Sequence, residues 1–403
     1  MNGIEKAKNF IFNRFFCEKT GLIYDFLIDD GNAWHHLPSP HEIKKQIPNP
    51  CGWGTGMEDS VLNGGSVLDA LAAECFISED ISAIKPFADK IFDGMVLCAN
   101  AGNVKGFIAR SVSPLDGKSF YCNSSRDQYT HWIYGAVRFY NSPLCDERQK
   151  KIIKQILTDI AEKCLNDVTA ENDFNILRAD GKIGLCQKMW GELSPHEYLR
   201  LPMFYAAAYH VTGDIKQKTL CDKYAAEALE KTKVFTPEKH RCYVTLQLQY
   251  SLRLLCDCYG SSSFFDECSA IMEALADYCE NKAFTAYKEL KANNLSFKYN
   301  RWNDVVPLNM DKYGDYEYLN PAQSELDENT SFYPLREIGE AASVAALCYS
   351  RPINRQLCTI LESAADEIDY SKHYTYAPLL LACGHSLCKE NIFKTNKEAL
   401  QSL

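Results

Sequence analysis

The sequence lacks the signals that would assign it at once to several large classes of protein. It has no cluster of lysine and arginine interleaved with aromatic residues, and its net charge of −10 does not suit a nucleic-acid partner. It also has no glycine-rich phosphate loop, dinucleotide fingerprint or Ser-His-Asp arrangement. We therefore expect neither a nucleic-acid partner nor a cofactor.

Export, membrane and metal signals are equally weak. No apolar run is long enough to cross a bilayer, and the segment 1–16 mixes charges with apolar residues and has no small-residue cleavage site, so it predicts an amphipathic first helix. The 18 cysteines are scattered singly, as small buried hydrophobes are, which predicts a reduced, cytoplasmic protein. Cys256 and Cys258 have no second pair at zinc-site spacing, so we predict no metal site.

Helical periodicity dominates what is present, and strand signals are sparse. The predicted helices are 3–17, 58–76, 79–99, 126–141, 146–165, 196–212, 214–231, 238–258, 262–281, 333–349, 353–368 and 372–388. Small hairpins are predicted at 107–123, around the turn 114–117, and near 24–31. Glycines inside helices, such as Gly65 and Gly135, each cost about 1 kcal/mol against alanine, so we expect close helix packing there.

The segment 106–140 is the most informative part of the chain, because it is too rich in polar and aromatic residues for a core. Ser125 and Gln128 have the spacing of a capping box, which predicts a helix from Arg126. Asp127 then shares a stripe of this helix with His131 and Tyr134. This stripe predicts one wall of a polar pocket. A first-turn carboxylate that only complements the helix dipole is the alternative for Asp127.

Two motifs, 52–65 (GWGTGMEDSVLNGG) and 123–135 (NSSRDQYTHWIYG), resemble segments of the six-hairpin glycosidase superfamily, including the unsaturated glucuronyl and rhamnogalacturonyl hydrolases. The resemblance implies an all-α fold, an (α/α)6 toroid of about twelve helices that spans residues 1–403 as one domain. It matches Asp127 to the second acid of such enzymes and Asp59 or Glu58 to the first. It implies a glycosidase that acts on short oligosaccharides, which we expect to contain uronic acid.

Glycoside hydrolysis uses a carboxylic acid and usually a second carboxylate. Asp59 and Glu58 lie about 100° apart around a helix, so we expect only one of them to face the substrate. Asp59 is preferred because it shares its face with Asn63 and Ser66, whereas Glu58 shares its face with apolar residues. Glu192 is the reserve second carboxylate.

Substrate binding is predicted for aromatic, guanidinium and polar side chains in or beside the long loops. Aromatic rings stack on sugar faces, and arginine forks match a carboxylate. The predicted substrate-binding residues are Trp53, Arg110, Tyr121, Asn123, Arg126, His131, Trp132, Tyr134, Trp190, Glu192, Arg301, Trp302 and Asp304.

Three other functions stay open at this point. The same toroid supports sugar epimerisation by histidines, for which His131, His210, His240 and His385 are available, and a polysaccharide lyase that uses Tyr134 and His131. A non-catalytic carbohydrate-binding protein is the third. Oligomeric state is left open by the sequence.

Overall fold

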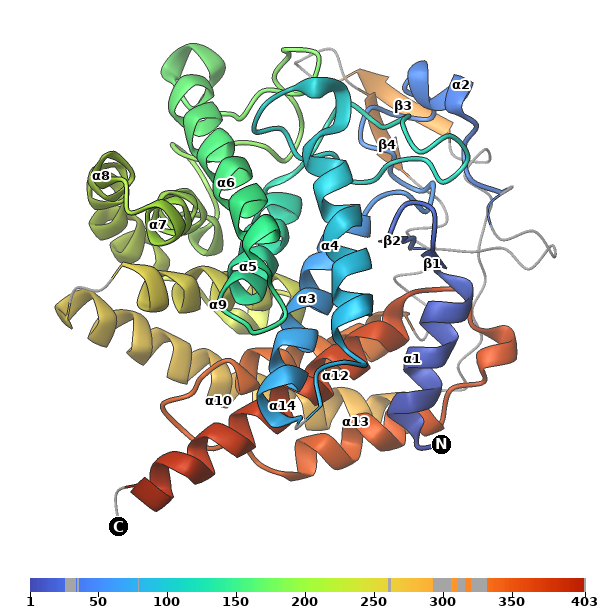
Figure 1. The fold of residues 1–403 in the computed structure, drawn as a ribbon, viewed down its shortest axis with the longest axis vertical. Coiled ribbons are helices and arrows are strands. Elements are labelled where there is room, and N and C mark those ends of the chain that lie inside the picture. The colour runs from blue at the N-terminus through green and yellow to red at the C-terminus, as the bar shows by residue number, and fades with distance from the viewer. Residues whose placement is uncertain are drawn as a thin grey trace.

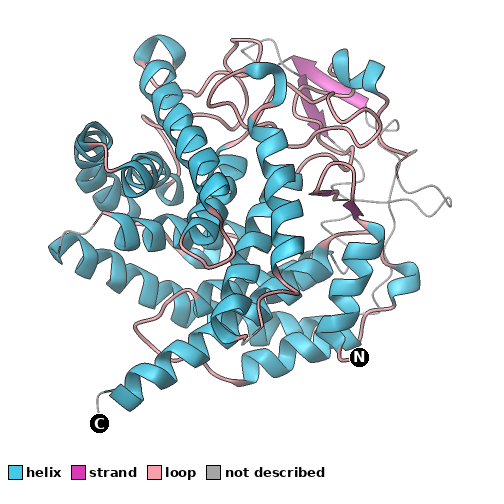
Figure 2. Ribbon diagram, viewed as in Figure 1, coloured by secondary structure: helices cyan, strands magenta, loops and turns pink. Residues whose placement is uncertain are grey.

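The computed structural model describes residues 1–25, 34, 36–78, 80–259, 262–292, 306–310, 316–319 and 332–401. Within these residues the protein is all-α, as predicted, and strands occur only in short pieces (Figure 2). The helices are α1 (Gly3–Arg14), α2 (Pro40–Lys44), α3 (Ser60–Ile77), α4 (Lys85–Ala99), α5 (Arg126–Tyr140), α6 (Glu147–Asp167), α7 (Arg200–Thr212), α8 (Ile215–Thr232), α9 (Cys242–Cys258), α10 (Ser262–Ala292), α12 (Phe332–Ala346), α13 (Gln356–Asp366) and α14 (Ala377–Gln401). Except for the five-residue α2, each of these matches one predicted helix.

Six of the helices form a closed ring, which is the (α/α)6 toroid expected from the sequence. The inner helices α3, α5, α7, α9, α12 and α14 each pack against the next, and α14 packs against α3. The outer helices α4, α6, α8, α10, α13 and α1 pack against the inner ones. Figure 1 shows how the C-terminal helix α14 returns beside α3, close to the start of the chain. The contact between α14 and α3 therefore closes the ring.

Glycine sets the closest approach between inner helices. A Cβ on Gly65 of α3 would lie 2.2 Å from the carbonyl oxygen of His131 on α5, and a Cβ on Gly135 of α5 would lie 2.5 Å from the carbonyl oxygen of Gly65. Any larger side chain would force the two helices apart. The expectation that these helix-interior glycines mark close packing is confirmed.

The predicted hairpins fit less well. The described strands pair as β1 (Phe16–Cys17) with β2 (Leu22–Ile23) and β3 (Val306–Met310) with β4 (Tyr316–Leu319), both antiparallel. Residues 107–123 form a turn in which the Ser113 amide donates to the Ser119 carbonyl over 2.8 Å, but no strands flank it. Most of the 24–31 segment lies outside the described residues, and the observed hairpin precedes it. The backbone at 107–123 is irregular and forms no strand pair, because amides of this segment donate to side chains and to other loops.

Helix α3 corrects the prediction that no apolar run is long enough to cross a bilayer. By length and composition alone it could cross a membrane, but 83% of it is buried inside the protein. A core helix of the ring meets the same criteria, because inner helices are covered on all sides.

Candidate functional site

A circle of polar contacts joins all six inner helices at the end of the ring where these helices begin. Each contact is between neighbouring inner helices or the residues just before them. Four contacts are hydrogen bonds, which join Asp59 to Gln128, Asp127 to Arg200, Arg200 to Gln247, and Tyr376 to Asp59. Two are cation–π contacts of Arg336, whose guanidinium carbon lies 5.3 Å from the ring centroid of Tyr243 and 5.6 Å from that of Tyr376. We call this set of residues the polar circle. Loops and helix first turns thus gather charged groups at one end of a rigid scaffold, where function usually lies.

Asp59 is the residue just before α3, and its carboxylate faces the circle. Gln128 Nε2 donates to its Oδ1 over 3.0 Å, and the Tyr376 hydroxyl donates to its Oδ2 over 3.3 Å. The Arg110 guanidinium lies 4.0 Å from Oδ1, and the Asp59 side chain is 24% exposed. Asp59 therefore combines fixed hydrogen bonds with access to solvent, as a group that reacts with a substrate needs.

Glu58 precedes Asp59 in the turn before α3, so the predicted comparison of helix faces does not apply to these two residues. Glu58 is 9% exposed, and its Oε1 accepts a hydrogen bond from the Gly54 amide. Burial, followed by the neighbouring charge of Asp59, raises the pKa of Glu58 to about 8, against the opposing effect of the Gly54 amide, Arg110 and Arg336. Glu58 thus keeps a proton at neutral pH immediately beside Asp59.

Asp127 lies on the opposite side of Gln128, in the first turn of α5. Its Oδ1 accepts from Arg200 Nη1 over 2.6 Å, and its side chain is 37% exposed. Burial raises its pKa, but Arg200, then Arg126 and Arg110, outweigh that effect and hold the pKa well below its ordinary value. Asp127 is therefore ionised at any physiological pH, and more than the helix dipole holds it in place.

The predicted pocket wall on α5 is corrected by the structure. His131 is buried and bonds through Nδ1 to Ser66 over 3.1 Å, and burial lowers its pKa to about 3, so it is neutral. Tyr134 is buried and stacks on Tyr250 with ring centroids 4.0 Å apart. Both side chains point between the inner helices because successive turns of α5 carry the stripe away from the polar circle and into the ring.

Four further predicted binding residues serve the fold. Trp132 is fully buried and donates to the Met95 carbonyl over 3.0 Å, so it cannot stack on a sugar. Tyr121 is buried and donates to the Ile47 carbonyl over 2.6 Å, and Asn123 is buried among loop groups that include the Leu185 carbonyl, 3.1 Å away. Trp190 packs edge-on against Tyr224 of α8, with centroids 4.7 Å apart. These four are corrected because their polar atoms or rings are used in packing.

The remaining predicted residues differ in position. Trp53 is half-buried beside Arg110, whose guanidinium carbon lies 5.8 Å from the ring centroid, so it lies near Asp59. Arg126 pairs with Glu197 and donates to the Lys188 carbonyl over 3.0 Å. Glu192 is exposed, outside the polar circle. The predictions Arg301, Trp302 and Asp304 lie outside the described residues.

Sequence reasoning missed several members of the circle. Gln128 was assigned to a capping box, but its side-chain Nε2 donates to the Glu58 carbonyl and to Asp59, both over 3.0 Å. Arg200 begins α7 and is 1% exposed, and Arg336 lies on α12, where it pairs with Glu340 over 2.8 Å. A charged residue inside an otherwise apolar helical pattern, as in LRLPMF at 199–204, was the available signal for Arg200.

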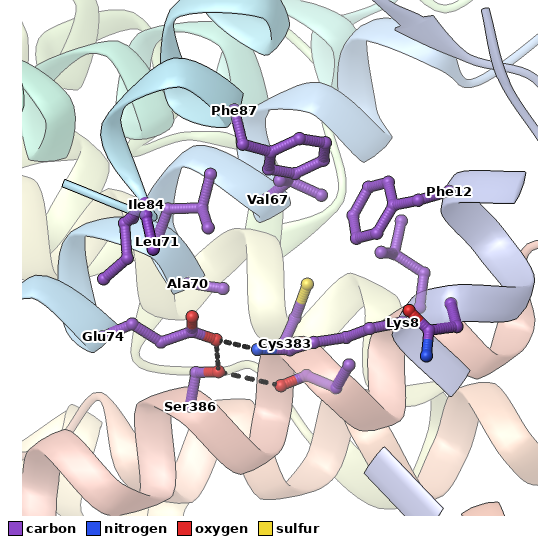
Figure 3. A pocket seen from close by; sticks show the side chains of 14 residues that line it. Lys8, Phe12, Val67, Ala70, Leu71, Glu74, Ile84, Phe87, Cys383 and Ser386 are labelled. Atoms are coloured by element: carbon purple, nitrogen blue, oxygen red, sulfur yellow. Dashed lines mark hydrogen bonds and ion pairs between the residues drawn. The ribbon is translucent and has the colours of Figure 1, made fainter. Parts of the chain in front are cut away.

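A separate cavity of about 360 Å³ lies between α1, α3, α4 and α14. Figure 3 shows mostly apolar walls, with Glu74 held by Lys8 and by the Ser386 hydroxyl, which donates over 2.6 Å. Glu74 is 15 residues beyond Asp59, or about 22 Å along a helix that rises 1.5 Å per residue. Glu74, the acid that lines this cavity, is thus already paired and lies far from the polar circle. The cavity is therefore not the candidate active site.

No family model matches the chain, and no curated protein matches it in sequence. Among solved structures, the GH76A α-1,6-mannanase of Salegentibacter sp. HEL1_6 is similar with a TM-score of 0.48 and 11% identity, over 97% of this chain and 98% of that one. An inactive variant of that mannanase in complex with α-1,6-mannotriose gives a TM-score of 0.48 and 10% identity over 97% and 98%.

The family 76 mannosidase Bt3792 of Bacteroides thetaiotaomicron VPI-5482 is similar with a TM-score of 0.49 and 11% identity, over 99% of both chains. At these values the likeness transfers no residue role to this chain. The toroid is established by the helix contacts within the protein itself.

Proposed function

We propose that the protein is a glycoside hydrolase that acts on short oligosaccharides. One observation carries the proposal: two acidic groups at the starts of neighbouring inner helices have pKa values that are shifted in opposite directions. The pKa of Glu58 is raised to about 8, whereas arginines hold the pKa of Asp127 below its ordinary value. Pairs of carboxyl groups whose environments separate their pKa values are typical of acid and base roles in glycosidases.

The geometry supports a division of labour. Asp59 is the exposed member of the Glu58–Asp59 pair, so its carboxyl group is the proposed donor to the leaving glycosidic oxygen, and protonated Glu58 lies directly beside it. The bond from the anomeric carbon to that oxygen breaks as the oxygen takes the proton. Asp127 is the proposed base that accepts a proton from the water attacking the anomeric carbon, and its ion pair with Arg200 keeps it ionised.

The expected uronic acid needs a cation to bind its carboxylate. Among the described candidates, Arg126 is paired with Glu197, and Arg110 donates to the Glu58 carbonyl over 3.3 Å and lies beside Asp59. A uronide therefore has to share these guanidinium groups, whereas a neutral oligosaccharide does not. Both classes belong in the substrate test, and α-1,6-mannotriose is included because a similar solved structure binds it.

The alternative reactions lack comparable support. An epimerase needs a histidine that moves a proton, yet His131 is buried and its pKa is lowered to about 3 by burial. His210 lies at the far end of α7, beside Asn141 at 3.0 Å. A lyase that uses Tyr134 meets the same obstacle, because that hydroxyl is buried within the ring.

The cytoplasmic location also remains our proposal. All 18 cysteines are free thiols in the structure, and most are buried among apolar side chains. Such usage suits a reducing compartment.

The test is product analysis by mass spectrometry after incubation with saturated and 4,5-unsaturated uronyl disaccharides and α-1,6-mannotriose. Asp127→Asn and Asp59→Asn should each lower kcat by about 100-fold or more, since each removes one partner of general acid–base catalysis. Glu147→Gln, which alters an exposed acid of the outer helix α6, is the matched control and should leave kcat unchanged.

Intact substrates throughout would refute the proposed hydrolase for these sugars and would favour a binding protein. Cleavage that survives in Asp127→Asn at the wild-type rate would remove Asp127 from the mechanism.

A further inference from the structure

We propose that Asp25 is a positioning residue for Asp59. Hydrogen bonds of the Asp25 side chain and of its backbone hold Asp59 in place. Asp25 lies two residues after the end of β2, far from Asp59 in sequence, and it is 1% exposed. The inference rests on the proposed function, because it assumes that Asp59 is the exposed acid of the site.

The Asp25 side chain holds the turn that precedes α3. Its Oδ2 accepts hydrogen bonds from the amides of Glu58 and Asp59 over 2.6 and 2.8 Å, and its Oδ1 accepts from Asn63 Nδ2 over 3.1 Å. One buried carboxylate thus fixes two consecutive amides and a side chain one turn into the helix. The position and direction of the Glu58–Asp59 peptide are set by this group.

This arrangement leaves the Asp59 carboxylate available. An aspartate at the N-cap usually accepts a hydrogen bond from an amide in the first turn of its own helix. Asp59 makes no such bond, and its oxygens instead face Gln128 and Tyr376. Asp25, from another part of the chain, supplies the anchoring at the start of α3 that Asp59 does not.

The backbone of Asp25 completes the link. Its amide donates to the Gly56 carbonyl over 3.0 Å, and its carbonyl accepts from the Tyr376 amide over 3.1 Å. Tyr376, which is fully buried, donates its hydroxyl to Asp59 Oδ2. Asp25 therefore fixes both the peptide that carries Asp59 and one of the two side chains that hold its carboxylate.

The electrostatic effect of Asp25 can be separated from its hydrogen bonds. Burial, then Asp59 and Glu58, raise the pKa of Asp25, and the amides of Asp59 and Glu58 oppose that rise. In Asp25→Asn, the amide oxygen still accepts from both backbone amides. The new NH2 group can donate to Asn63 Oδ1, which has no hydrogen-bond partner, once the Asn63 amide rotates. This variant removes a titrating carboxyl and keeps the contacts.

The expected shift depends on every charge near the acid pair. The titratable and charged groups that face Glu58 and Asp59 are Asp25, Arg110, Arg336, Glu340 and Tyr376. Asp25 opposes the ionisation of Glu58, while the two arginines favour it. Loss of Asp25 therefore moves the titration of Glu58 to lower pH.

The experiment compares Asp25→Asn and Asp25→Ala with Asp69→Asn. Asp69 is also a fully buried acid of α3, but it pairs with Arg138 over 2.6 Å, away from the polar circle. Carboxyl carbon NMR titration of Glu58 and Asp59 is the first readout and needs no substrate. The pH dependence of kcat and KM on a cleaved oligosaccharide is the second.

We expect Asp25→Asn to move the titration of Glu58 to lower pH. Asp25→Ala should lower kcat by about 100-fold with KM nearly unchanged, because Asp59 loses its position. Asp69→Asn should leave the titration where it is. An unchanged titration in Asp25→Asn, or an equal shift in Asp69→Asn, would overturn the inference even if Asp25→Ala fails to fold. Absence of hydrolysis by the wild type would instead overturn the proposed function and leave the titration result to judge Asp25.

Discussion

Replacement of Glu58 by glutamine should stabilise the protein, and increasingly so as the pH rises. The pKa of this buried acid rises from an ordinary value of 4.5 to about 8 in the folded state. Each pKa unit is worth about 1.4 kcal/mol, so ionisation of Glu58 destabilises the fold by up to about 5 kcal/mol above pH 8. Glutamine keeps an oxygen to accept from the Gly54 amide and never ionises.

The direction follows from proton binding. Between pH 4.5 and 8 the folded protein holds the Glu58 proton and the unfolded chain does not, so this group's contribution to stability falls as the pH rises through that window. The wild type and Glu58→Gln should be about equally stable near pH 4.5, and the variant should be more stable at pH 8.

Urea denaturation at four or five pH values from 5 to 8.5 measures the difference in the free energy of unfolding. Glu147→Gln is the control, because Glu147 is an exposed acid whose pKa is lowered by Lys150, so its effect should be flat over the same range. A stability difference for Glu58→Gln that does not change with pH would refute the reasoning.

Two other perturbations test the packing and the base. Gly65→Ala should destabilise the protein by about 3 kcal/mol in urea denaturation, because its Cβ would lie 2.2 Å from the His131 carbonyl oxygen. Gly64→Ala is the control and should have little effect on stability, because the nearest neighbour of its Cβ is a flexible side chain at 3.0 Å. Equal effects of the two substitutions would contradict the close approach of the helices at Gly65. Arg200→Gln should raise the pKa of Asp127 toward its ordinary value, since Arg200 is the largest influence that lowers it. The acid limb of the kcat/KM profile should then appear at higher pH, and a profile identical to the wild type would exclude Asp127 as the base.

The helices were predictable from the sequence because their signals are local. Apolar periodicity and Ser125 at the N-cap placed the start of α5 at the observed residue, and the structure confirms that Ser125 Oγ accepts from the Gln128 amide over 3.4 Å. Helix ends were less accurate: the predicted helix 79–99 begins at Lys85, and 262–281 continues to Ala292. Fraying and capping at such ends depend on contacts that the local pattern does not contain.

The site was only partly predictable, because the burial of a side chain depends on how far along an inner helix it lies. Asp127 and His131 share one stripe of α5, yet one turn of the helix separates a carboxylate that is 37% exposed from a buried, neutral imidazole. Periodicity gives the face of a helix and not the depth within the ring. A helical stripe in a toroid therefore predicts function only in its first turn, which is why Asp127 lies at the site and Trp132 lies in the core.

Asp25 was missed for a different physical reason. Its partners are amides 33 and 34 residues away, and backbone amides have no residue identity that a sequence pattern can show. The same holds for Arg200, whose acceptor Asp127 is 73 residues distant. Long-range hydrogen bonds to the turn that carries the proposed acid become visible only when the ring closes, so the residues that position the proposed acid and base are the part of the site that required the structure.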